Sequence, residues 1–275
     1  MKSHITLLSM KRLASLLSFT VIFAFLFVAT PAPKVEAAVS SLASIQSGDL
    51  IRGESRNAVY YYGADGFRYV FGNDKVYFTW YDNFDSVRWL SDADLGTIQI
   101  GGNVTYHPGT RMVKINSDPK TYAVGQGGTL RWVTSESVAI AMYGATWNKQ
   151  IDDVPDSFFS NYAHGADITS TTDFIPATVK ASVPSINVDK NLKAPAMMSI
   201  GASAYSPVLV TIQVGTAVRF TNTDTDKHTV TSDDLTWGSG TMEAGAVFTR
   251  RFNDVGVHTF FDSYRPQSTG TIIVQ

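Results

Sequence analysis

The last third of the chain consists of short segments in which apolar and polar residues alternate. Val208, Val210 and Ile212 alternate with their neighbours in one segment, and Gly215 provides a turn before the next. Side chains along a β-strand point to opposite faces in turn, so this pattern predicts strands with one buried face. Several such strands at spacings of about 8 to 12 residues predict an antiparallel β-sandwich in residues 195–275.

The N-terminal segment has the three parts of a secretory signal. Lys11 and Arg12 precede an apolar run over residues 13–30, and a small-residue site ends at Ala37. This order predicts a Sec-type signal peptide over residues 1–37 and a protein exported to the cell surface or the medium. The apolar run is also close to the ~18 residues that can span a membrane, so an uncleaved membrane anchor is the alternative.

The composition excludes several classes of function. The chain has no Cys, which rules out disulfides, thiolate metal ligands and thiol nucleophiles. It has 22 Lys and Arg against 24 Asp and Glu, and removal of residues 1–37 takes away four of the bases and one acid. A mildly acidic exported protein lacks the basic face that nucleic-acid binding requires, so no nucleic-acid partner is expected.

Residues 45–167 are rich in aromatics and Gly and are predicted to form a β-rich domain with one or two short helices. Two strand–turn–strand patterns lie in this domain about 62 residues apart, with Gly63 aligned to Gly125. Their Gly-rich turns suit tight hairpins, and their repetition predicts a duplicated hairpin unit. The unit resembles modules of exported proteins of uncultured bacteria. This resemblance implies a cell-surface or envelope context and names no ligand.

Helix signals follow the second hairpin. Ser135 is a suitable N-cap for a helix over Glu136–Tyr143, and Gly144 is a suitable stop. Another short helix is predicted to start at Pro155 and to end before Gly165.

Residues 168–194 lack sustained periodicity and are rich in Ser, Thr, Lys and Pro. This composition predicts a semi-extended linker between the two domains. The alternative is that residues 181–188 add an edge strand to one of the domains.

Seven short motifs lie within residues 195–275, at 203–207, 210–215, 218–223, 228–232, 238–240, 256–260 and 270–274. Together they resemble the motifs of the cupredoxin family, in particular its plastocyanin and amicyanin type. The resemblance implies a Greek-key sandwich with a copper site at one end. In that family a His from a mid-chain loop is joined by a Cys, a His and a Met from the loop between the last two strands.

Aligning the framing glycines of that loop without a gap places the family's ligand positions in this chain. His228 falls at the first His, Asp262 at the Cys, Arg265 at the second His and Ser268 at the Met. A carboxylate, a permanent cation and a hydroxyl cannot replace a thiolate, an imidazole and a thioether, so neither a type 1 copper site nor any other cofactor is expected. Asp262 and Arg265 are instead predicted to pair and to organise the loop. Weak metal binding is left only to His228 and Asp262.

Other candidate sites are isolated or poorly spaced. His107 and His164 stand alone, His258 is predicted on a strand face, and the acidic segments 92–94 and 152–156 lack the spacing of a calcium loop. The sequence contains no nucleophile elbow, Gly-rich phosphate loop or zinc-binding helix motif. The chain is therefore not expected to be an enzyme. Paired carboxylates that meet only in the fold leave hydrolysis of an envelope polysaccharide as an alternative.

Aromatic residues concentrate in the first domain. They include Tyr60, Tyr61, Tyr62, Tyr69, Phe78, Trp80, Tyr81 and Trp89. We expect them to fill the core of a domain that is short of Leu and Ile, the alternative being a surface that stacks on sugars or partner proteins. The predicted function is an exported, non-catalytic binding or structural protein of the bacterial cell surface, with an unidentified cell-surface protein or polysaccharide as partner. A copper-binding or electron-transfer protein is the first alternative, and an envelope polysaccharide hydrolase is the second.

Overall fold

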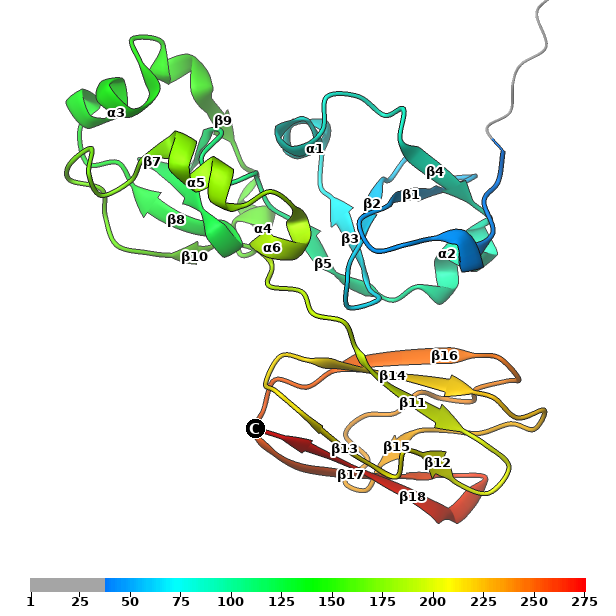
Figure 1. The fold of residues 1–275 in the computed structure, drawn as a ribbon. Helices are drawn as coiled ribbons and strands as arrows, with labels where there is room; N and C mark the ends of the chain where they lie inside the picture. The colour runs from blue at the N-terminus through cyan, green and yellow to red at the C-terminus, as the bar shows by residue number, and fades with distance from the viewer. Residues whose placement is uncertain (1–37) are drawn as a thin grey trace, which may run out of the picture. The chain divides into compact units, whose positions relative to one another are not determined.

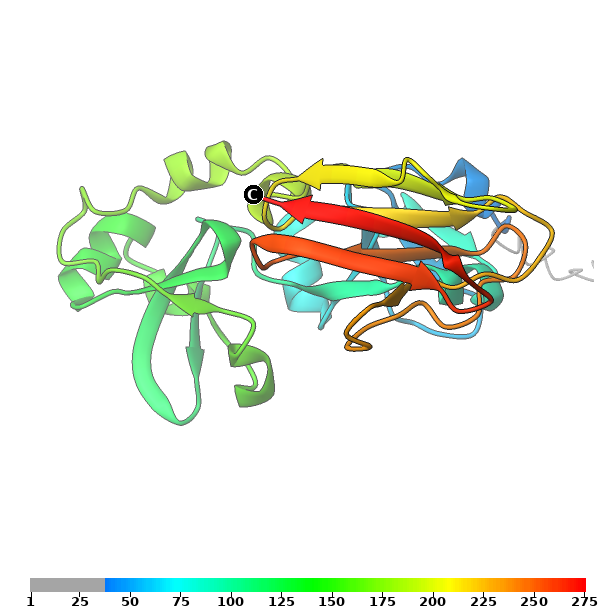
Figure 2. The same cartoon turned by 90° about the horizontal axis from the view of Figure 1, so that it is seen from below.

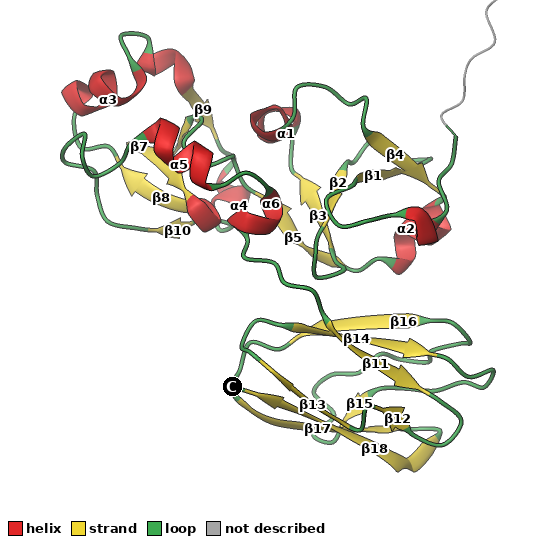
Figure 3. Ribbon diagram, in the orientation of Figure 1, coloured by secondary structure: helices red, strands yellow, loops and turns green. Residues whose placement is uncertain are grey.

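The computed structural model describes residues 38–275 and is mostly β (Figure 1). These residues contain four β-sheets and six short α-helices, which Figure 3 distinguishes by colour. The predicted signal segment, residues 1–37, lies outside the described residues. Among residues 38–275, no helix has the length and apolar character needed to cross a membrane.

The first sheet has five strands in the order β4-β1-β2-β3-β5. β1, β2 and β3 form an antiparallel meander, β4 runs parallel to β1, and β5 runs parallel to β3. The turn between β2 and β3 is the predicted hairpin, and its Gly66 has a φ of 82°, which glycine adopts without strain. The elements are β1 (Leu50–Gly53), β2 (Tyr60–Tyr62), β3 (Arg68–Phe71), α1 (Asp74–Trp80), β4 (Val87–Leu90), α2 (Asp92–Thr97) and β5 (Ile100–Val104), after a 3-10 turn at Leu42–Ser44.

The second sheet has the same topology, in the order β10-β8-β7-β6-β9. β6, β7 and β8 form the meander, β9 runs parallel to β6, and β10 runs parallel to β8. In each sheet one helix follows the third strand and another follows the fourth. The elements are β6 (Met112–Ile115), β7 (Asp118–Gly125), β8 (Thr129–Trp132), α3 (Glu136–Tyr143), β9 (Ile151–Asp153), α4 (Asp156–Phe159) and β10 (Ala163–His164), with 3-10 turns at Gln126–Gly128 and Trp147–Gln150.

Main-chain hydrogen bonds of the two units coincide at an offset of 62 residues. The N–H of Phe71 donates to the carbonyl of Val59 at 3.1 Å. The residues 62 positions further on make the same bond, from the N–H of Val133 to the carbonyl of Thr121 at 2.9 Å. The same strand order, the same parallel additions and the same register are what duplication of one unit would produce.

The helix after each meander is capped by an equivalent side chain. The Asn73 side chain accepts a hydrogen bond from the N–H three residues on, and Ser135 does the same at the start of α3. α3 spans the predicted residues and is followed by Gly144, which has a φ of 83°. The second predicted helix is present as α4, with Pro155 in the N-cap position.

Substituting Ser135→Ala is expected to lower the free energy of unfolding by about 1 kcal/mol, because one N–H of the first turn of α3 loses its acceptor. Urea denaturation measures the loss. Ser157→Ala is the matched control, since the Ser157 side chain is exposed in α4 and makes no hydrogen bond among residues 38–275. Equal losses in the two variants would contradict a capping role for Ser135.

The prediction of a semi-extended linker at residues 168–194 is wrong. The segment contains α5 (Pro176–Ser182) and α6 (Ile186–Asp189), and it does not add an edge strand at 181–188. Phe174, Val183 and Ile186 in this segment are buried in hydrophobic clusters. Pro176 and Pro184 interrupt the apolar pattern of this segment, so it produces no sustained periodic signal, yet each of the three residues gains stability from burial.

Residues 196–274 form a sandwich of two four-stranded sheets, in the orders β12-β11-β14-β16 and β13-β18-β17-β15. From β12 to β17 each successive strand lies in the other sheet, in the manner of a Greek key. The pairing is mixed, because β11 runs parallel to β14 and β13 runs parallel to β18. Parallel pairs need a long connection, and here the chain passes through the other sheet between the two strands of each pair. The strands are β11 (Ala196–Ile200), β12 (Tyr205–Ser206), β13 (Leu209–Ile212), β14 (Ala217–Asn222), β15 (Thr231–Ser232), β16 (Val247–Arg251), β17 (Gly256–Asp262) and β18 (Arg265–Val274).

Aromatic rings fill the interior of the sandwich. Phe220 and Phe260 are fully buried, with ring centroids 5.4 Å apart in an edge-to-face arrangement. Figure 2 shows the long hairpin of β17 and β18 in orange and red. This hairpin carries Asp262 at the end of one strand and Arg265 at the start of the next, so it positions the candidate site.

Candidate functional site

His228 lies in the loop between β14 and β15, and its imidazole is fully buried. The main chain of His228 exchanges two hydrogen bonds with that of Met242. The side-chain amide of Asn222, at the end of β14, donates to the carbonyls of Asp226 at 2.8 Å and of Met242 at 2.9 Å. These bonds fix the loop and the orientation of the imidazole.

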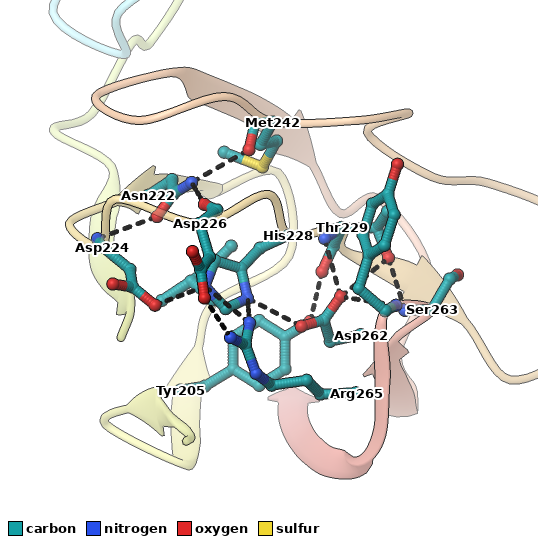
Figure 4. A network of polar contacts seen from close by, with 12 residues as sticks. Tyr205, Asn222, Asp224, Asp226, His228, Thr229, Met242, Asp262, Ser263 and Arg265 are labelled. Atoms are coloured by element: carbon teal, nitrogen blue, oxygen red, sulfur yellow. Dashed lines mark hydrogen bonds and ion pairs between the residues drawn. The ribbon is translucent and has the colours of Figure 1, made fainter. Parts of the chain in front are cut away.

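Asp262 is fully buried at the end of β17 and contacts the same imidazole (Figure 4). Its Oδ2 lies 2.7 Å from Nδ1 of His228. Its Oδ1 accepts hydrogen bonds from the main-chain N–H groups of Thr229 at 2.9 Å and Tyr264 at 3.1 Å. Both carboxylate oxygens are therefore bonded, and Asp262 ties the His228 loop to the hairpin.

Asp224 binds the other ring nitrogen of His228. Its Oδ2 lies 3.0 Å from Nε2, and this hydrogen bond lowers the pKa of Asp224 below its usual value. An ionised carboxylate can only accept hydrogen bonds, so two carboxylates at the two ring nitrogens are both satisfied only when both nitrogens carry protons. Asp262 and Asp224 thus hold the imidazole between them through its two nitrogens.

Arg265 adds a second cation beside the ring. Its Nη1 lies 3.2 Å from both ring nitrogens of His228, and its Nη2 donates to Asp226 at 2.6 Å. The predicted ion pair between Asp262 and Arg265 is therefore wrong. The Asp262 carboxylate is already occupied by three N–H donors, so the guanidinium extends to the exposed Asp226 instead.

The structure brings together three of the four positions that the sequence singled out. Ser268 lies in β18, is buried, and its hydroxyl has no hydrogen-bond partner among residues 38–275. The register of the hairpin shifts between Phe261 and Asp262, so residues 266–268 bulge from the strand pair. Among the described residues, no hydrogen bond joins Ser268 to His228, Asp262 or Arg265.

Sequence reasoning missed Asp224 and Asp226, which complete the cluster. Both precede His228 by four residues or fewer in a loop rich in Thr and Asp. Such a composition is usual for exposed turns, so it gave no signal of contact with a buried ring. The spacing Asp-x-x-x-His was the available clue. A loop that turns back on itself can bring residues four apart into contact.

The other three histidines of residues 38–275 make separate contacts. His107 is buried and stacked on Trp80, with Nδ1 3.0 Å from the carbonyl of Thr79 and Nε2 2.9 Å from that of Val183. His258 contacts the carbonyl of Asp254, as suits a strand residue near a turn. His164 packs against the rings of neighbouring aromatics. Within residues 38–275, no group of three or more acidic or His side chains has a geometry that could hold a metal ion.

The acidic segments of the first domain make hydrogen bonds and ion pairs. The Asp92 carboxylate accepts from the N–H of Ser55, and the main-chain N–H of Asp94 donates to Ser91 at the start of α2. Asp152 pairs with Arg111 at 2.5 Å. The carboxylates of Asp92 and Asp152 are therefore bonded to other groups of the protein.

Most of the aromatics of the first domain belong to its core. Tyr61, Tyr69 and Tyr77 are buried, and Tyr60, Tyr62, Trp80, Tyr81 and Trp89 are partly buried. Phe78 is 49% exposed and Phe84, which the sequence did not single out, is 48% exposed. The aromatic content thus builds a core and leaves a small aromatic surface near α1.

No family model and no curated protein matches the chain. Among solved structures it is similar to a purple cupredoxin from Nitrosopumilus maritimus, with 29% identity and a TM-score of 0.28 over 29% of this chain and 99% of that one. A copper-containing nitrite reductase from Thermus scotoductus has 21% identity and a TM-score of 0.29 over 30% of this chain and 23% of that one. An amicyanin variant has 17% identity and a TM-score of 0.28 over 30% of this chain and 82% of that one. The chain therefore spans less than a quarter of the nitrite reductase, and TM-scores of this size assign it no function.

Proposed function

We propose that the chain is an exported, non-catalytic binding or structural protein of the bacterial cell surface, and that its C-terminal sandwich is a cupredoxin-like scaffold that carries no copper. The observation that supports this most strongly is the engagement of both ring nitrogens of His228. Asp262 and Asp224 hold them at 2.7 and 3.0 Å. A metal ligand needs a free nitrogen lone pair, and this imidazole offers one only after a carboxylate is displaced.

The residues present do not fit a type 1 copper ion. Such a site uses two imidazoles and a soft thiolate sulfur. Asp262 offers a hard oxygen that is already occupied by three N–H donors. Arg265 holds a permanent positive charge 3.2 Å from both nitrogens of His228, which would repel a metal cation. Charged side chains of the protein occupy the pocket around His228.

The burial of His228 also supports a non-catalytic role. A general acid or base must come within hydrogen-bond reach of the substrate, directly or through one water molecule. The His228 ring is fully buried, and its nitrogens are bonded to carboxylates of the same domain. The ring of His107 is likewise buried between two main-chain carbonyls.

Export and a cell-surface location rest on the sequence. The charged start, apolar run and small-residue site of residues 1–37 have the order of a signal peptide. The mildly acidic remainder and the lack of Cys are compatible with an exported protein whose cores are large enough to fold without disulfides. We propose a cell-surface polysaccharide or protein as the partner.

Sedimentation with isolated bacterial envelopes tests this function. The chain from residue 38 onward should sediment with the envelopes and should release no reducing sugars from them. Failure to sediment would contradict the binding role. Release of sugars would favour the second alternative, an envelope polysaccharide hydrolase.

The first alternative is a copper-binding or electron-transfer protein. It is motivated by His228, which stands at the position of a copper ligand in the family that residues 195–275 resemble. Stoichiometric copper that survives dialysis, with strong visible absorption, would favour this alternative.

A further inference from the structure

The two units of the first domain carry grooves in equivalent places. Groove A, of about 560 Å³, is lined by Val59, Phe71, Asn73, Asp74, Tyr77 and Phe84, among others. Groove B, of about 170 Å³, is lined by Thr121, Val133, Ser135, Glu136, Ala139 and Trp147, among others. The first five residues of groove B stand 62 positions after the first five of groove A, and Trp147 stands 63 after Phe84.

Each groove combines an aromatic ring with short polar side chains at the start of a helix. In groove A, Phe84 stacks on Tyr77 with ring centroids 4.3 Å apart and is 48% exposed. The hydroxyl of Tyr77 donates to the carbonyl of Asn83 at 2.7 Å, which holds the supporting ring in place. In groove B, Trp147 is partly buried against the core that contains Ala139. Both rings are thus presented from a rigid support.

The polar groups of the grooves are amides, hydroxyls and carboxylates. Asn73 and Asp74 stand at the start of α1, and Ser135 and Glu136 stand at the start of α3. Among the residues that line the two grooves there is no Lys or Arg. Lys120 lies nearby, with its ammonium 4.8 Å from the ring centroid of Trp132 at the side of groove B. An acid at the same position in both grooves disfavours an anionic ligand.

Resting on the proposed binding function, we propose that grooves A and B bind a neutral polysaccharide. The C–H face of a sugar ring packs on an exposed aromatic ring, while its hydroxyls bond to amides and carboxylates at the groove rim. Two equivalent grooves on one chain suit a ligand that presents the same chemistry repeatedly. A polymer that occupies both grooves gains effective concentration at the second groove, which a short oligosaccharide cannot supply.

Affinity electrophoresis of the chain from residue 38 onward tests this proposal. The probes are hydroxyethylcellulose, dextran and galactomannan, with polygalacturonate as the anionic comparison. At least one neutral polymer should retard the protein, and polygalacturonate should not. The polymer should also bind at least tenfold more tightly than a trisaccharide of the same sugar. Equal retardation by polygalacturonate, or retardation by none of the neutral polymers, would overturn the proposal.

Single substitutions locate the binding. Phe84→Ala and Trp147→Ala should each weaken binding of the retarding polymer about tenfold, and the double variant should weaken it further. Ile140→Ala is the matched control, because its side chain is exposed on α3 and lines neither groove. It should leave binding within about twofold. Unchanged binding in Phe84→Ala would overturn the proposal even if Trp147→Ala failed to fold.

The outcomes separate this proposal from the function on which it rests. If the protein sediments with envelopes but binds no neutral polymer, the binding role stands and the glycan ligand is overturned. If the protein binds the polymer and releases sugars from it, polysaccharide binding by the grooves is supported and the non-catalytic role is overturned.

Discussion

Replacing Asp262 with Ala is expected to lower the free energy of unfolding by about 3–5 kcal/mol, because several buried donors lose their acceptor at about 1–3 kcal/mol each. The variant leaves the buried His228 imidazole bonded to only one carboxylate, that of Asp224. It also leaves the main-chain N–H groups of Thr229 and Tyr264 without their acceptor. Urea denaturation of the chain from residue 38 onward, followed by fluorescence, measures this loss.

Asp226→Ala provides the control in the same loop. The Asp226 side chain is 64% exposed and its carboxylate pairs only with Arg265 among the described residues. Exposed ion pairs contribute about 0–1 kcal/mol, so this variant should be nearly as stable as the natural protein. Equal losses for the two variants would show that burial of Asp262 does not matter to the cluster.

Phe260→Ala is expected to cost about 3–5 kcal/mol as well, because it opens a cavity at the centre of the sandwich. The ring of Phe260 is fully buried and makes edge contacts with Tyr205 at 4.8 Å and with Phe220 at 5.4 Å between centroids. Across the hairpin it lies opposite Gly270, where a Cβ atom would collide with the ring. The glycine therefore makes room for the aromatic that fills the core.

Val257→Ala is the control on the same strand. Its side chain is 67% exposed, so its loss should change the free energy of unfolding by less than about 0.5 kcal/mol. The midpoint of urea denaturation should fall strongly for Phe260→Ala and hardly at all for Val257→Ala. A small effect of Phe260→Ala would mean that the sandwich is not centred on this ring.

The fold was predictable where local chemistry agrees with the final structure. Ser135 and Gly144 mark the ends of α3 because capping and the positive φ are properties of these residues themselves. Val210 and Ile212 alternate with polar or exposed neighbours in β13 because they face the interior, whereas Val208, predicted on the same face, precedes the strand and is 54% exposed. Residues 168–194 were misread because the burial of Val183 and Ile186 depends on surfaces far away in the sequence.

The sequence predicted where the candidate site lies, but it did not predict which of its residues bond to one another. Alignment with the family that residues 195–275 resemble predicted that His228, Asp262 and Arg265 lie close together, and they do. Their pairing depends on which donors lie beside the Asp262 carboxylate, and main-chain N–H groups supply two of its four hydrogen bonds. Main-chain donors have no signature in a sequence, so the choice between Arg265 and His228 as the partner of Asp262 needed coordinates.

The copper content of the dialysed protein tests the central claim, that charged side chains of the protein surround His228 and exclude a copper ion. The chain from residue 38 onward and its Asp262→Cys/Arg265→His variant are loaded with Cu(II), dialysed, and measured by metal analysis and visible absorption. The natural protein should retain no copper. The variant restores two imidazoles and a thiolate, so it should hold one copper per chain with intense thiolate-to-copper absorption. One copper per chain in the natural protein, with the same absorption, would contradict the claim.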